Sequence, residues 1–303
     1  MAEKKRFFYG WLILLTCILI MGLGYAPLVS CASLFTKPVT EDLGFTRSGY
    51  ALVSTIAALM MAFMSPFIGK IMSKPYMHKA LVVCMIGNCL AYYCYSFAST
   101  LPQFYVTAAC IGFFECGSTM IPVSVLITNW FRKKRGLVMS IAMVGSSIGG
   151  TILSPIIGNL IASQGWRFTY KAVGITRLVI LVPLVLLVIR RTPADMGTKA
   201  YGADEEGETG KARKTEREWN VSLKEVKKKP MFWCFVLGCT LISATAAVIT
   251  QIPASVMDAG YATTTAASIA SLYLFIDIHG KMERGYIYDK DGEKKEKKKK
   301  KKK

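Results

Sequence analysis

The sequence is poor in histidine and in acidic residues. It contains two histidines, His78 and His279, and 19 Asp and Glu residues against 38 Lys and Arg. The two histidines lie far apart, and no zinc-binding spacing of cysteine and histidine surrounds either of them. The sequence also lacks a glycine-rich phosphate loop and a catalytic-triad pattern. These absences predict a protein that is not an enzyme and that uses no metal and no other cofactor.

The formal net charge is +19, although 52% of the residues are hydrophobic. The apolar residues form blocks about 20 residues long, and most of the Lys and Arg residues lie between the blocks. A basic nucleic-acid-binding protein would instead interleave basic and aromatic residues on a soluble fold. The pattern therefore argues for a lipid bilayer, and against nucleic acid, as the partner. The closing residues 293–303, mostly lysine, are of the kind that forms a solvated, disordered tail.

The cysteines give no sign of metal binding. All of them lie inside the apolar blocks, where a free thiol behaves as a small hydrophobic group. We therefore expect small buried side chains at Cys17, Cys31, Cys84, Cys89, Cys94, Cys110, Cys116, Cys234 and Cys239.

Eight apolar stretches are long enough to cross a membrane as helices. At about 1.5 Å per residue, about 20 residues cross a hydrocarbon core of roughly 30 Å. The first stretch is too long for a signal-peptide core and has no small-residue cleavage site after it. The eighth is the weakest, because charged residues crowd its final third. The sequence thus predicts an all-α integral membrane protein with spans at about 7–35, 50–72, 80–97, 103–128, 137–162, 170–189, 231–253 and 262–286.

The loops differ in charge, and the difference predicts an orientation. Basic residues precede the first span and lie between spans two and three, four and five, and six and seven. The loops at 99–102 and 258–260 contain no Lys or Arg. Cytoplasmic loops carry the excess of positive charge in membrane proteins. We therefore expect a multi-pass protein of the plasma or inner membrane with its N-terminus in the cytoplasm.

The stretch 129–170 is the one around which the chain is organised. It begins Asn-Trp-Phe-Arg-Lys-Lys-Arg-Gly and continues into the fifth apolar span, whose small residues recur at every fourth position. This spacing places them on one helix face, where another helix can approach closely. Pro155 removes a backbone donor and favours a bend. The predicted packing face consists of Gly145, Gly149, Gly150, Ser154 and Gly158.

Two turns at matching places repeat one short pattern. Gly-x-x-x-(Asp/Ser)-(Lys/Arg) occurs after span two, from Gly69 to Lys74, and after span eight, from Gly285 to Lys290. Glycine allows a turn and close packing, and Asp289 with Lys290 could latch cytoplasmic helix ends. The second copy continues to Gly292. Repeated helical bundles are how secondary transporters are built.

These motifs resemble those of the major facilitator superfamily, whose members are transporters made of two six-helix bundles. The resemblance covers 7–292. The segments 129–136 and 191–197 are also similar to the oxalate/formate antiporter group, which is close to the monocarboxylate transporters. The resemblance to the superfamily implies a six-helix bundle at 1–189, a cytoplasmic linker at 190–230, part of a second bundle at 231–292 and the lysine-rich tail at 293–303.

Three departures from the family pattern weaken what the resemblance implies. Ser73 replaces an aspartate of the first turn motif, and Ala108 stands where many proton-coupled members have an arginine. The chain also ends after the eighth predicted helix, so that the family's last four helices are absent from it.

Glu115 lies near the middle of span four, where a carboxylate needs a cavity or a partner. The functional interpretation is that it carries a coupling proton. The structural alternative is a neutral, hydrogen-bonded glutamic acid.

Lys281 precedes Gly285 by four residues on span eight. The resemblance implies that a cation on this helix pairs with the substrate carboxylate, and the alternative is a lysine that extends to the cytoplasmic surface. Tyr25, after two glycines of span one, is interpreted either as a cavity-lining residue or as a packed aromatic.

Three further ionisable residues are interpreted as structural. Asp277 and His279 are two positions apart and therefore point to different sides of a helix, which argues against a proton relay. Arg177 on span six is expected to extend to the surface or to pair locally, because the resemblance places that helix at the periphery.

The leading hypothesis is a carrier for small organic anions of the oxalate, formate or monocarboxylate type. It would act by alternating access, as an antiporter with a counter-anion or as a symporter with a proton. The alternatives are a membrane fragment without transport activity and a drug-efflux carrier.

Overall fold

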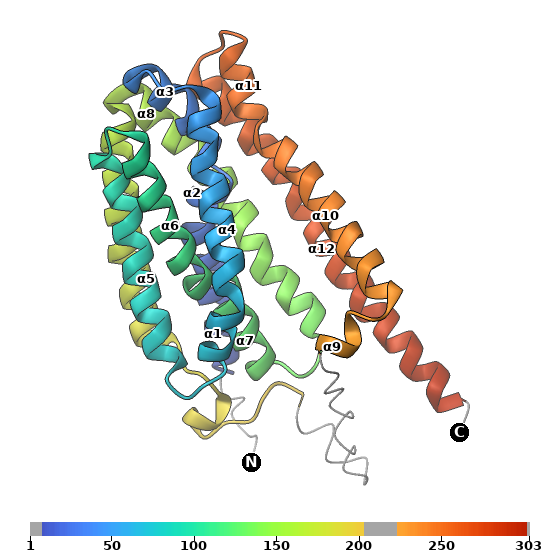
Figure 1. Cartoon of the computed structure of the whole chain (residues 1–303). Coiled ribbons are helices and arrows are strands. Elements are labelled where there is room, and N and C mark those ends of the chain that lie inside the picture. Colours follow the sequence, from blue (N-terminus) through green and yellow to red (C-terminus); the bar gives the residue numbers. More distant parts are fainter. Residues whose placement is uncertain (1–7, 203–222, 302–303) are drawn as a thin grey trace.

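The computed structural model describes residues 8–202 and 223–301. The regular elements in these ranges are helices, and the only strand-like contact there is an isolated bridge between Phe131 and Tyr201. The predicted all-α fold is therefore confirmed. Figure 1 shows an upright bundle, with the last helices placed along one side of it.

The first span is not one regular helix. It consists of α1 (Gly10–Leu19), the π-helix η1 (Ile20–Tyr25), α2 (Ala26–Val29), the 3₁₀ helix η2 (Ala32–Phe35) and α3 (Thr36–Leu43). Such π-helical turns occur frequently at functional sites. Gly44, with φ 65°, ends α3 in the left-handed region that glycine tolerates.

Three further spans follow the first. They are α4 (Arg47–Met72), α5 (Met77–Cys94) with η3 (Tyr95–Phe97), and α6 (Leu101–Ser118) with α7 (Met120–Trp130). Thr46 caps α4 by accepting a hydrogen bond from the backbone of Gly49 at 3.2 Å. The expected span at 103–128 is broken at Thr119, whose φ of −121° and ψ of −98° are not helical.

The longest helix, α8 (Arg135–Val188), contains two of the expected spans. It doubles back at Gly165, where φ is 79° and ψ is 167°, so residues 135–164 form a first arm and residues 166–188 a second arm. Glycine can adopt this positive φ because it has no Cβ. Pro155 lies inside the first arm, whose backbone stays helical there, and the bend at this residue stays a prediction.

The start of the linker packs against the bundle. The indole nitrogen of Trp130 donates to the carbonyl oxygen of Arg190 at 2.9 Å, and Asn129 donates to that of Arg191 at 3.1 Å. A short helix, η4 (Pro193–Met196), follows. The start of the expected linker is therefore held against the bundle, because these backbone groups bond to side chains at the end of α7. Residues 203–222 lie outside the described residues.

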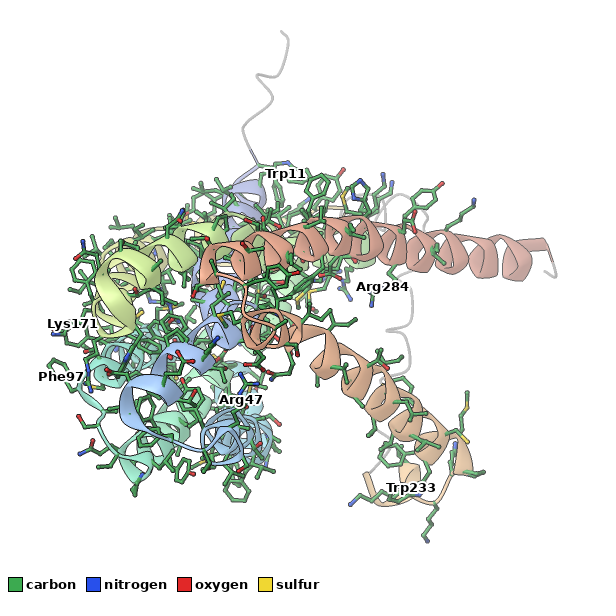
Figure 2. All side chains as sticks on the ribbon, turned by 90° about the horizontal axis from the view of Figure 1, so that it is seen from above. Trp11, Arg47, Phe97, Lys171, Trp233 and Arg284 are labelled. Carbon is green, nitrogen blue, oxygen red and sulfur yellow. The ribbon has the colours of Figure 1, made fainter. Side chains whose placement is uncertain are left out.

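The remaining helices are α9 (Leu223–Val226), α10 (Pro230–Thr250), α11 (Ile252–Asp258) and α12 (Thr263–Lys301). α12 packs along the first arm of α8 and runs antiparallel to it, since Gly158 faces Ala267 and Gly285 faces Ser140. α10 lies apart from the bundle, and Trp233 near its start is 58% exposed (Figure 2).

The structure corrects two expectations for the last helix. Residues 285–292 continue α12 and do not turn, and residues 293–301 are helical where a disordered tail was expected. Lys and Glu are good helix formers, so this segment can extend a helix already formed. The side chains of Tyr288, Asp289 and 291–303 lie outside the described part of the chain.

Six stretches of the described residues are long and apolar enough to cross a membrane. One of them is the two-armed α8, and α12 is not among them. The expected burial of the cysteines is wrong at Cys94, Cys110, Cys234 and Cys239, which are exposed on the outer faces of the helices. Lipid is the solvent of such faces, so an apolar thiol is stable there without burial.

Candidate functional site

The first arm of α8 presents small residues to two different partners. Gly145 and Gly149 face helix one, where the backbones of Ile18 and Gly22 leave no space for a Cβ. Gly22 lies in η1, so the π-helix packs directly against the first arm. The predicted close-packing face is thus present at these glycines.

The neighbouring face of the same arm contacts α12. A Cβ at Gly150 would lie 2.6 Å from the Leu274 side chain. The Ser271 hydroxyl donates to the carbonyl oxygen of Thr151 at 2.7 Å. Ser154, beside Pro155, is buried against Cys31, with 3.4 Å between oxygen and sulfur. The arm is therefore held between helix one and α12.

Lys281 lies at this contact between α8 and α12. Its ammonium group is 2.7 Å from a carboxylate oxygen of Asp277 and donates to the hydroxyls of Ser146 at 2.9 Å and Ser147 at 2.6 Å. Ser147 also donates to Asp277 at 2.7 Å. The Lys281 side chain is 25% exposed, so the cation is neither free in solvent nor fully enclosed. This group of four residues is called the Lys281 cluster below.

Asp277 belongs to the Lys281 cluster, although sequence reasoning assigned it no role. The i,i+4 spacing of an acid and a base on one helix was the signal that indicated their pairing. His279 is exposed and contacts Phe275, with 5.8 Å between ring centroids. The prediction that Asp277 and His279 point to different sides is confirmed.

A second polar group lies inside the first six spans, around Arg177 on the second arm of α8. The side chain is 2% exposed, so the first of the two expectations for it, extension to the surface, is wrong. Its Nη2 donates to the carbonyl oxygen of Gly24 in η1 at 2.9 Å and to the side-chain oxygen of Asn88 on α5. The guanidinium carbon lies 5.0 Å from the ring centroid of Tyr92. The tertiary fold thus places Arg177 between two other segments, η1 and α5.

Glu115 is buried near the same group. It is 5% exposed, and one of its carboxyl oxygens has no hydrogen-bond partner. Thr119, one helical turn after Glu115, and Leu181, one turn after Arg177, lie 3.5 and 3.7 Å from where a Cβ would stand on Gly24, the residue before Tyr25. Tyr25 is half-buried at the end of η1. Glu115 and Tyr25 therefore belong with Arg177, and Lys281 belongs to the other cluster.

The two turn motifs have different surroundings. A Cβ at Gly69 would meet open space, and the carbonyl oxygen of Ser73 accepts a hydrogen bond from Arg191 at 2.9 Å. Gly285, in contrast, packs against the start of α8. Lys74 is exposed, and Lys290 lies 5.5 Å from the ring centroid of Tyr286. Both motifs lie at the end of the bundle where α8 begins, which we call the basic end.

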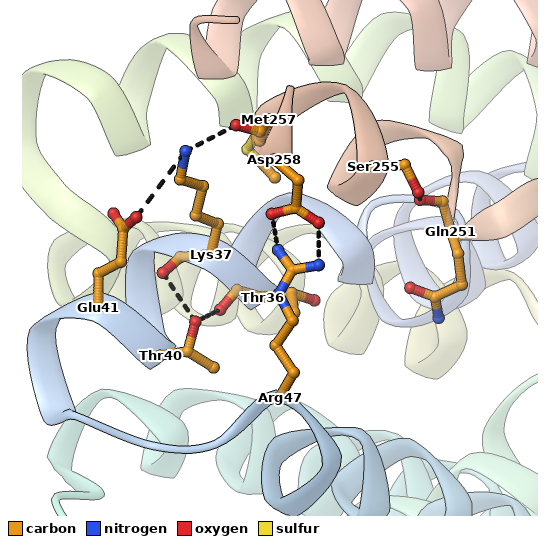
Figure 3. A network of polar contacts seen from close by, with 9 residues as sticks. All are labelled: Thr36, Lys37, Thr40, Glu41, Arg47, Gln251, Ser255, Met257 and Asp258. Carbon is orange, nitrogen blue, oxygen red and sulfur yellow. Dashed lines mark hydrogen bonds and ion pairs between the residues drawn. The ribbon is translucent and has the colours of Figure 1, made fainter. Parts of the chain in front are cut away.

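The opposite end of the bundle, which we call the distal end, joins the first helices to α11. Arg47 and Asp258 form a two-bond ion pair, and Lys37 donates to the carbonyl oxygen of Met257 at 2.6 Å (Figure 3). Lys37 also lies 3.8 Å from Glu41. These contacts close the distal end between the first two spans and the seventh.

Comparison with known proteins places this geometry in a family. The chain is 25% identical over 278 residues to monocarboxylate transporter 4 of Gallus gallus, covering 90% of this chain and 56% of the relative. It is 24% identical over 229 residues to human monocarboxylate transporter 2, covering 74% of this chain and 45% of the relative. An Aspergillus niger protein, the MFS-type transporter pynF, is 27% identical over 189 residues, covering 61% of this chain and 43% of that protein. The chain spans about half the length of these curated relatives.

A solved structure shares the fold. The crystal structure of a bacterial homologue of the human lysosomal transporter Spinster, in an inward-facing and unoccupied conformation, matches with a TM-score of 0.70 and 18% identity. The match covers 90% of this chain and 60% of that protein. The sequence profile of the Major Facilitator Superfamily matches residues 12–298. Nearly the whole chain is covered by that profile, and the helical fold agrees with it, so the chain is a multi-pass membrane protein that belongs to the Major Facilitator Superfamily.

Proposed function

We propose that the chain contributes to the transport of small monocarboxylate anions, with Lys281 as the group that binds the carboxylate. The observation that carries this proposal is the position of Lys281 at the contact between α8 and α12. The names of the mammalian and avian relatives support the substrate class. An ammonium group with a partly exposed side chain can exchange a protein carboxylate for a substrate carboxylate at little desolvation cost.

The mechanism follows from the packing of the first arm. Alternating access requires one bundle to rock against the other about a central site. The small residues from Gly145 to Gly158 give the first arm a smooth surface, which can slide against helix one and α12. Ser146 and Ser147 hold Lys281 from the α8 side, so a movement between the helices changes the surroundings of the cation. The domain boundaries proposed for this movement are 1–189, 190–230 and 231–292.

The ion coupled to transport is either a proton or a counter-anion. In the proposed orientation, the distal end of the bundle faces the outside of the cell. Labelling with an impermeant maleimide tests the orientation. Ser99→Cys at the distal end should react in intact cells, whereas Ser73→Cys should react only after permeabilisation. The reverse pattern would invert the proposed topology.

Binding to the purified chain tests the substrate class directly. Labelled lactate, formate and oxalate are added to the chain in lipid nanodiscs. We expect one of them to bind, and Lys281→Gln to weaken that binding about tenfold or more, since a charge-assisted pair is lost. Lys70→Gln, which changes an exposed lysine on α4, is the matched control. Absence of binding by all three anions, or equal loss in both variants, would overturn the proposal.

A further inference from the structure

Glu115 is the single acidic residue between Asp42 and Asp195. The structure buries its carboxyl group near one buried guanidinium, that of Arg177, because the residues one helical turn after each of them, Thr119 and Leu181, both pack against Gly24. An isolated ionised group in a low-dielectric interior is strongly disfavoured, so such groups pair or become neutral. The two side chains are nevertheless not hydrogen-bonded to one another here.

Several buried hydrogen-bonding groups around Arg177 have no partner. Arg177 Nε and Nη1, Asn88 Nδ2, the Tyr92 hydroxyl and Glu115 Oε1 are all buried without a partner. Native proteins leave few buried polar atoms unpaired, and each such atom needs an explanation. Free donors on Arg177 and a free acceptor on Glu115 complement each other. A second arrangement, in which they bond, would satisfy both.

We propose that Glu115 and Arg177 form a proton-operated switch on helix one. With Glu115 protonated and neutral, Arg177 bonds Gly24 and Asn88 as observed. When Glu115 releases its proton to water, its carboxylate draws the guanidinium away from Gly24, and η1 loses the bond that fixes its last turn. Arg177 is thus a positioning residue. The role of this switch in transport rests on the proposed function, for which it names the proton as the coupling ion.

The position of Gly24 explains why the switch would reach the Lys281 cluster. Gly24 lies in η1, two residues after Gly22, which packs backbone to backbone against Gly149 of the first arm. The same arm carries Ser147 on its other side, where Ser147 holds both Lys281 and Asp277. A shift of η1 therefore moves the helix that positions the cation.

The other titratable groups around Glu115 do not offer a competing charge. The titratable side chains near its carboxyl are Tyr25 on η1, Tyr95 on η3, the adjacent Cys116, and Cys84 of α5, which packs against Gly117. α4 packs against α6 and contributes Tyr50, but no Asp, Glu, Lys, Arg or His between Ser48 and Gly69. These phenols and thiols are neutral near pH 7. Arg177 therefore supplies the charge on which the switch depends.

Hydrogen exchange of the substrate-free chain in nanodiscs tests the switch. Peptides covering residues 20–25 are compared between the unchanged chain and Glu115→Gln, which mimics the protonated form, at equal pH. The intrinsic chemical exchange rates then cancel. We expect a rate ratio near one in acid and about tenfold in mild alkali, because only the unchanged chain frees Gly24. Glu41→Gln, an exposed acid at the distal end, should give a ratio near one at both pH values.

A ratio that does not change with pH would overturn the switch. Arg177→Lys tests the same link with Glu115 intact: it keeps the charge but lacks the guanidinium fork, so exchange at 20–25 should be fast at both pH values. Slow, pH-dependent exchange in this variant would also contradict the proposal. Since no substrate is present, failure of carboxylate binding leaves this result unaffected, and a pH-independent ratio leaves the binding proposal standing.

Discussion

A Cβ added at Gly158 would lie 2.6 Å from the Cβ of Ala267, so the first arm of α8 and α12 touch almost backbone to backbone. Gly158→Val should therefore force the two helices apart. We expect a loss of about 1–3 kcal/mol in the free energy of unfolding, the usual cost of overpacking. Thermal unfolding in detergent measures this loss.

The matched control for that change is Gly238→Val. Gly238 lies in α10, and a Cβ there would meet nothing within 4 Å. This substitution should change the melting temperature little. Equal destabilisation by the two valines would show that the contact between α8 and α12 contributes nothing to stability.

The ion pair between Arg47 and Asp258 should contribute little to the free energy of unfolding, but it should hold the distal end closed. Both side chains are partly exposed, at 49% and 37%, so solvent screens their attraction. We expect a double-mutant cycle of Arg47→Gln and Asp258→Asn to give a coupling energy of about 0.2–1 kcal/mol. Raising the ionic strength should reduce it.

The same two variants should also increase hydrogen exchange in α11, because the bond to Arg47 helps to fix the end of that helix. The charge reversal Arg47→Asp with Asp258→Arg should restore slow exchange. If the reversed pair exchanges as fast as the single variants, the contact does not hold the distal end closed.

Asp277 should compete with the substrate for Lys281. In Asp277→Asn the ammonium group loses its ion partner and keeps the two serine hydroxyls. We expect carboxylate binding to tighten by up to about tenfold, since the anion no longer displaces a protein carboxylate. Equilibrium binding of the labelled anion in nanodiscs measures the change.

Glu283→Gln provides the control for this effect, because Glu283 is an exposed acid on the same helix. It should leave the affinity unchanged. Weaker binding in Asp277→Asn would mean that Asp277 orients Lys281 for the substrate and does not compete with it.

The sequence alone determined the membrane fold and the family. Apolar blocks of spanning length dictate helices, because lipid offers no partner for a free backbone amide. The close-packing glycines from Gly145 to Gly158 were also readable, since small residues at every fourth position leave a local signature. Lys281 was identified by its place in a resembling motif.

Only the tertiary structure decided which charges meet. Arg177 looked like a peripheral cation because its partners, Gly24, Asn88 and Tyr92, come from segments about 85–153 positions away in the chain. Periodicity reports which face of a helix is apolar, but not which neighbour that face meets. The same reason separates Glu115 from Lys281. A sequence contains no measure of the distance between helices, and packing placed the carboxyl of Glu115 with Arg177 and that of Asp277 with the lysine.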